Sequence, residues 1–136
     1  MAIGGQGWPV NGEDASRNGA IRFREGQLTT VFVQTLPNST KCDGLTEACR
    51  IAWMAYEHGV QWVPHGWNTA VGLAADLQLS AAMPVATYVE FLTPSPYVDE
   101  IITTPFRPDA EGYLTIPDKP GLGIELNRES LKKYGC

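Results

Sequence analysis

The chain has 136 residues, of which 43% are hydrophobic and 18% charged, and its formal net charge at pH 7 is −5. This composition is typical of one globular domain with its own core, and an acidic balance without a basic cluster disfavours nucleic-acid and anionic-membrane partners. The sequence contains no apolar run near the roughly 20 residues of a membrane span, and it does not start with the basic-then-apolar order of a signal peptide.

The first quarter of the chain predicts three elements. Residues 1–12 are Gly-rich and predict a short strand or loop that leads to Glu13. Residues 15–26 predict a short helix, and residues 29–34 are β-branched and apolar, which favours a strand.

The central part predicts two helices that alternate with two strands. Apolar residues recur at helical spacing from Leu45, and Gly59 supplies the stop of this helix. A strand over 60–63, a helix over 69–82 and a second strand over 85–89 follow. Strand and helix in strict alternation with short connections predict right-handed βαβ units, and hence an α/β protein with a parallel sheet.

The remaining residues do not continue the alternation of strands and helices. Residues 103–120 predict a Pro- and Asp-rich loop that a brief extended stretch at 113–116 interrupts. Residues 121–126 look extended, and Asn127 is a plausible N-cap for a short final helix over 128–134.

Titratable residues follow directly after two consecutive predicted strands. His65 comes just after the strand at 60–63, and Glu90 comes at the end of the strand at 85–89. The carboxyl ends of parallel strands are where α/β sheets and barrels place their chemistry. The sequence therefore predicts a site that contains His65 and Glu90.

Five segments resemble, in order and in spacing, the carboxyl-terminal half of an enolase-superfamily enzyme of the mandelate racemase and muconate lactonizing type. These segments are residues 11–13, 36–48, 63–75, 88–90 and 116–123. The resemblance implies a parallel (β/α) half-barrel, equivalent to the last four βα units of a TIM-type barrel, with an irregular C-terminal tail. It implies a division into residues 1–97, half of a (β/α)8-type barrel, and residues 98–136, a C-terminal extension that packs on the barrel.

The resemblance also assigns roles to single residues. It implies that Glu13 is a ligand of Mg²⁺, which prefers carboxylate oxygens. It implies that His65 is the base that removes a proton alpha to a carboxylate, because a neutral imidazole can take a proton near pH 7. It implies that Glu90 is an acid that hydrogen-bonds the substrate carboxylate, and such a donor requires a raised pKa.

Three further residues belong to this predicted site. Asn38 stands where the family commonly has Asp paired to the histidine. An amide can orient the ring but supplies no charge, and Asn38 is equally well interpreted as a turn residue. Trp67 and Asn68, just after the histidine, are candidates to line the substrate pocket or to pack as an ordinary loop.

Two functions of different class remain open. The first is a fragment of a Mg-dependent enzyme, a racemase or sugar-acid dehydratase, acting on a small carboxylate or sugar acid. In the family, two more metal carboxylates and a Lys-x-Lys base lie on earlier strands, so we expect the isolated chain to be inactive. The alternative is a non-catalytic half-barrel that self-associates, or a small-molecule binding module. A half-barrel would expose inward apolar residues, for which Val31, Val33 and Val85 are candidates, and it would favour a homo-oligomer.

The cysteines bear on the compartment of the protein. Cys42, Cys49 and Cys136 are odd in number and lack the spacing of a zinc site. Reduced thiols in a cytoplasmic protein are the simplest interpretation.

Overall fold

The structure, a computed structural model, describes residues 34–35, 37–66 and 68–135 of the chain, without the side chains of residues 34 and 35. The elements predicted over 1–12 and 15–26 lie outside these residues, and so do Glu13 and Trp67. Val31 and Val33 lie outside them as well.

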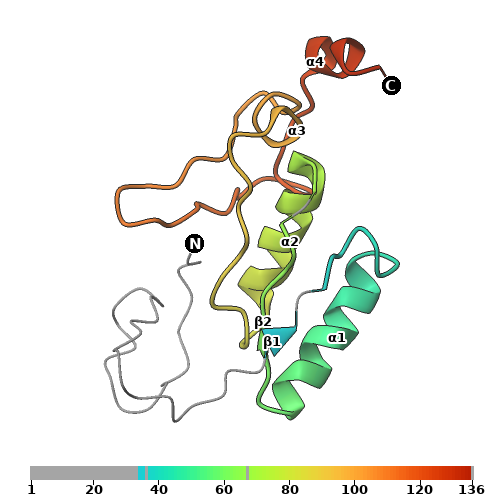
Figure 1. Cartoon of the computed structure of the whole chain (residues 1–136), viewed down its shortest axis with the longest axis vertical. Helices are drawn as coiled ribbons and strands as arrows, with labels where there is room; N and C mark the ends of the chain where they lie inside the picture. The colour runs from blue at the N-terminus through green and yellow to red at the C-terminus, as the bar shows by residue number, and fades with distance from the viewer. Residues whose placement is uncertain (1–33, 36, 67, 136) are drawn as a thin grey trace.

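A βαβα unit forms the centre of the molecule. Strand β1 (Gln34–Thr35) leads into helix α1 (Leu45–Glu57), and strand β2 (Gln61–Trp62) leads into helix α2 (Ala70–Ala82). The two strands pair in parallel, with Gln34 opposite Gln61 and Thr35 opposite Trp62. Figure 1 shows α2 in the centre of the molecule with the short strands at its lower end, and α1 beside them at the lower right. The predicted α/β class and parallel pairing are confirmed.

The strand predicted over 85–89 does not form as a regular strand, and this prediction is wrong. Ala86 forms an isolated parallel bridge with Trp62, whose N–H donates to Val85 O over 3.1 Å. The N–H of Glu90 then donates to Pro64 O over 3.5 Å. This segment therefore runs alongside β2 in the parallel direction, but the contacts are too widely spaced to build a continuous ladder of hydrogen bonds.

Helix α1 packs on the sheet through small residues. Ala48, Ala52 and Ala55 recur at helical spacing and are buried, so the helix backbone approaches its neighbours closely. Ala48 and Ala52 share a core cluster with Trp62, Leu79 and Val85. The prediction that Val85 is an exposed apolar residue is wrong, because its side chain is buried in this cluster between the two helices.

Helix α2 is buried on nearly all sides. Leu73 and Leu77 contact a second core cluster, while Leu79 belongs to the cluster under α1. The second cluster is completed by residues from the chain that follows: Val89, Val98, Ile101, Ile102, Phe106 and Leu114. Because both clusters contact α2, this helix is the centre of the fold.

The C-terminal part adds two short helices. Helix α3 (Pro96–Asp99) packs against α2, and helix α4 (Arg128–Lys133) lies next to the C-terminus. Asn127 is the N-cap of α4, as predicted, and its Oδ1 accepts hydrogen bonds from the N–H groups of Glu129 and Ser130. No helix in the described part of the chain is long and apolar enough to cross a membrane.

Candidate active site

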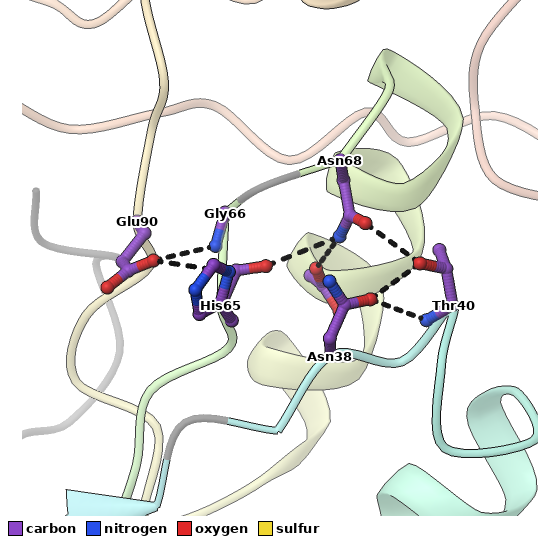
Figure 2. A network of polar contacts seen from close by, with 7 residues as sticks. Asn38, Thr40, His65, Gly66, Asn68 and Glu90 are labelled. Carbon is purple, nitrogen blue, oxygen red and sulfur yellow. Dashed lines mark hydrogen bonds and ion pairs between the residues drawn. The ribbon is translucent and has the colours of Figure 1, made fainter.

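Three chain segments arrive at the site side by side. The N–H of His65 donates to Pro37 O over 2.9 Å, and the N–H of Glu90 donates to Pro64 O over 3.5 Å. These bonds continue the parallel pairing of the strands beyond their regular ends. As a result Asn38, His65 and Glu90, which are far apart in sequence, lie in one region (Figure 2).

His65 and Glu90 face each other. Glu90 Oε2 accepts a hydrogen bond of 2.8 Å from the N–H of Gly66 and lies 3.8 Å from His65 Nδ1. The two side chains are 38% and 44% exposed, so a solute can reach both. A protonated imidazole at this distance forms an ion pair with the carboxylate, and a neutral one can direct a ring N–H toward it.

Gly66 is required by this arrangement. A Cβ atom on residue 66 would lie 2.4 Å from the backbone oxygen of Glu90, which is far inside van der Waals contact. Only glycine allows the segments after the two strands to approach this closely, and the close approach brings the Gly66 N–H to the carboxylate.

Asn38 forms a turn. Its Oδ1 accepts hydrogen bonds from the backbone N–H of Thr40 over 3.0 Å and from Thr40 Oγ1 over 2.5 Å. An asparagine that bonds the backbone two residues ahead is an Asx turn, which redirects the chain after a strand. The Nδ2 of Asn38 is buried without a hydrogen-bond partner among the described residues. The turn interpretation of Asn38 thus has direct support, whereas its role toward His65 stays a prediction.

Asn68 connects the segments. Its Nδ2 donates to His65 O over 3.4 Å and to Asp76 Oδ2 over 3.0 Å, and its Oδ1 accepts from Thr40 Oγ1 over 2.8 Å. Gly72 makes room for it, because a Cβ on residue 72 would lie 2.7 Å from Asn68 Cγ and 2.9 Å from Thr40 Cγ2. Asn68 therefore holds the loop that follows His65 against the loop that follows Asn38.

Asp76 belongs to the same network, and the sequence analysis missed it. It lies on α2 with no exposed surface, and Ser39 Oγ donates to its Oδ1. Burial raises the pKa of the Asp76 carboxyl to about 6, against the opposing effects of the hydrogen bonds from Ser39 and Asn68 and of the charge on His65. One signal in the sequence could have revealed it, since Asp76 is the only charged residue in the 13 residues of α2.

A hollow of about 390 Å³ opens beside this network. Its walls come from the loop after β1, the start of α2 and the chain around α3. The lining residues are Thr40, Lys41, Asn68, Thr69, Leu92, Ser95 and Tyr97. Its size suits a small polar molecule, and Lys41 supplies a positive charge.

The residues that the structure describes do not form a metal centre by themselves. Among them, no three side chains of His, Cys, Asp or Glu come together in a way that could hold a metal ion. His65 and Glu90 form a pair only, and Glu13, the predicted ligand of Mg²⁺, lies outside the described residues.

An imidazole and a carboxylate at the ends of adjacent parallel segments, next to a hollow, occupy the position where α/β sheets and barrels commonly place their chemistry. The family described as enolase C-terminal domain-like matches residues 16–130. The chain belongs to this family, in the mandelate racemase and muconate lactonizing group of the enolase superfamily.

Individual relatives support this assignment. D-galactarolactone cycloisomerase from Agrobacterium fabrum is 40% identical over 107 residues, which are 72% of this chain and 28% of that enzyme. A D-galactonate dehydratase family member from Streptomyces bingchenggensis is 33% identical over 105 residues, 76% of this chain and 25% of that protein. The crystal structure of a mandelate racemase/muconate lactonizing enzyme from Jannaschia sp. CCS1 has a TM-score of 0.67 at 29% identity, and it covers 74% of this chain and 25% of that one. This chain thus spans only about a quarter of the length of its relatives.

Proposed function

We propose that this chain is the part of an enolase-superfamily enzyme that carries the base for removing a proton alpha to the carboxylate of a sugar acid. The observation that supports the proposal most is the placement of His65 Nδ1 3.8 Å from Glu90 Oε2 at the ends of adjacent parallel segments. Relatives named as a cycloisomerase of a sugar lactone and as a sugar-acid dehydratase favour this substrate class. Racemisation, dehydration and cycloisomerisation all fit such a first step.

In this proposal His65 takes the substrate proton. With Nδ1 directed at Glu90, the ring can hold its own proton on that side and accept the substrate proton at Nε2. Glu90 Oε2 is occupied by the Gly66 N–H, so Oε1 is the oxygen that would donate to a substrate carboxylate when Glu90 is protonated. The hollow lined by Lys41 and Asn68 would hold the rest of the sugar acid.

Magnesium is part of the proposal through Glu13 alone. Mg²⁺ prefers several oxygen ligands in octahedral geometry, so residues beyond the described part of this chain would have to complete its site. The TIM-type half-barrel and the division into residues 1–97 and 98–136 belong to the same proposal. The packing of Val98 and Ile102 against α2 supports an extension that covers the barrel.

The experiment uses a chimera. Residues 37–135 of this chain would replace the matching segment of the cycloisomerase from Agrobacterium fabrum. Exchange of the alpha proton would then be followed by NMR in D₂O over a panel of sugar acids. We expect at least one acid to exchange its alpha proton, and His65→Asn to abolish the exchange, with His58→Asn as the matched control. A folded chimera in which both variants exchange as fast as the parent would overturn the proposal.

The second candidate is a non-catalytic half-barrel that binds another copy of itself. The exposed apolar side chains of Trp53 and Met54 on α1, 45% and 63% exposed, favour it. Reading the DNA upstream of Met1 separates the two functions. An open frame that encodes further barrel strands supports the enzyme, whereas a start site at Met1 supports the half-barrel. Sedimentation equilibrium of the chain at micromolar concentration then tests self-association, and a folded monomer would contradict it.

A further inference from the structure

Among the described residues, the buried carboxylate of Asp76 has no cationic partner in direct contact. Its side-chain hydrogen-bond donors are the neutral groups Ser39 Oγ and Asn68 Nδ2, the backbone of Ser39 also bonds it, and α2 carries no other charged residue. Burying a carboxylate is costly unless its charge is compensated. A helix centre that needed only packing would carry an alanine or leucine here, as its neighbours Ala75 and Leu77 do.

The two donors come from the two loops that build the site. Ser39 directly follows Asn38, and Asn68 bonds the backbone oxygen of His65 over 3.4 Å. The carboxylate of Asp76 therefore fastens the loop after β1 and the loop after β2 to the same turn of α2. Displacing it would release both loops together.

Asp76 interacts electrostatically with two titratable groups. His65 lowers the pKa of Asp76, so the positive charge of the imidazole and the carboxylate attract each other. Cys42 is the second group, and its pKa is raised by burial first and in smaller part by Asp76, Asp43 and Glu47. Of these two groups only His65 can carry a positive charge. The Glu90 carboxylate already lies 3.8 Å from its Nδ1, whereas the neutral Asn38 supplies no charge.

Building on the proposed function, we propose that Asp76 is a positioning residue of the site: its carboxylate holds Ser39 and Asn68 in place and supplies, from α2, the negative charge near His65 that position 38 lacks. The base would thus be supported from the helix rather than from the end of the preceding strand.

The test is an NMR titration of the side-chain carboxyl carbons in the 136-residue chain, with Asp76→Asn used for assignment. We expect Asp76 to titrate near pH 6, far above the ordinary value of 3.8. His65→Gln should raise this midpoint by roughly half a pH unit, about a threefold change in proton affinity, because a favourable charge is removed. His58→Gln is the matched control, since the chain has two histidines and His58 lies exposed at the end of α1.

A purely structural carboxylate would not respond to the charge of His65. Equal midpoints in the His65→Gln and His58→Gln variants, or an Asp76 that titrates near its ordinary value in folded protein, would overturn the inference. Ser39→Ala gives a second test if His65→Gln unfolds, because losing its hydrogen bond should raise the Asp76 midpoint while Ser95→Ala should not. The titration needs no turnover. If the chimera is active but His65→Gln leaves the Asp76 midpoint unchanged, only this inference is rejected. If His65→Gln shifts the midpoint but the chimera is inactive, only the proposed function is rejected.

Discussion

Helices α1 and α2 have the same length of 13 residues but different roles. Helix α1 covers the sheet through three buried alanines and presents Trp53 and Met54 to solvent. Helix α2 is buried on nearly all sides; its Gly72 leaves room for Asn68, and its Asp76 bonds both loops of the site. The difference shows that both core packing and the site restrict which residues α2 can carry, whereas only packing on one face restricts those of α1.

The largest expected difference between the two helices lies in their leucines. Leu77→Ala removes a side chain with no exposure from the centre of α2 and should lower the free energy of unfolding by about 3 kcal/mol. Leu45→Ala, at a position in α1 that is 39% exposed, should cost less than about 1 kcal/mol. Urea denaturation followed by circular dichroism measures both. Similar losses would mean that α2 is not the centre of the core.

The second difference between the helices is a pH dependence of stability, which Asp76 on α2 should produce. Burial raises the pKa of Asp76 from 3.8 to about 6, so the folded protein binds this proton more tightly than the unfolded chain. Stability should therefore fall as the pH rises from about 4 to about 6 and then level off, by on the order of 3 kcal/mol.

Asp76→Asn provides the comparison for this slope. The variant should lose the decline between pH 4 and pH 6. Asp99 and Glu100 have lowered pKa values in the folded protein. They stabilise the fold at pH values above their pKa in the unfolded chain, and this stabilisation is lost only as the pH falls through their lowered pKa values. The measurement is the urea midpoint at pH 4.5 and pH 6.5 for both proteins. A parent protein that is equally stable at both values, or an unchanged slope in the variant, would contradict the role of burial.

A smaller effect is expected at Gly72. In an ordinary helix Gly→Ala stabilises by about 1 kcal/mol, but here the new methyl group would meet Asn68 Cγ at 2.7 Å and Thr40 Cγ2 at 2.9 Å. Gly72→Ala should therefore destabilise the protein by about 1 kcal/mol. Thr40→Ser removes one of the clashing atoms, and a double-mutant cycle should show that it recovers part of the loss. Strictly additive effects would show that the two sites do not touch.

The sequence predicted the parts of the fold that follow from local rules. The start of α1 at Leu45, the N-cap of α4 at Asn127 and the parallel βαβ order were all correct, because helical periodicity, capping chemistry and alternation of elements are local. Helix α3 was missed, although Ser95 and Pro96 are typical first residues of a helix, since four residues leave no periodicity to detect.

The site was predicted only where strand order determines it. The rule that parallel strands end at one edge brought His65 and Glu90 together, and the structure places them 3.8 Å apart. The strand-end rule does not predict which helix residues point toward this edge, and the sequence analysis therefore missed Asp76. The close approach of Gly66 to Glu90 was also out of reach, because it depends on the distance between two backbones rather than on any pattern in either segment.

The central claim is that His65 is the base and that Asn38 shapes the turn beside it. Alpha-proton exchange in the chimera with the cycloisomerase tests this most directly, by comparing His65→Asn with Asn38→Ala in protein shown to be folded. Loss of a general base commonly costs about 10²–10⁴-fold, so His65→Asn should reduce the exchange rate by at least about 100-fold and Asn38→Ala by about 10-fold or less. Equal losses in the two variants, or a His65→Asn variant that still exchanges at the parent rate, would contradict the account.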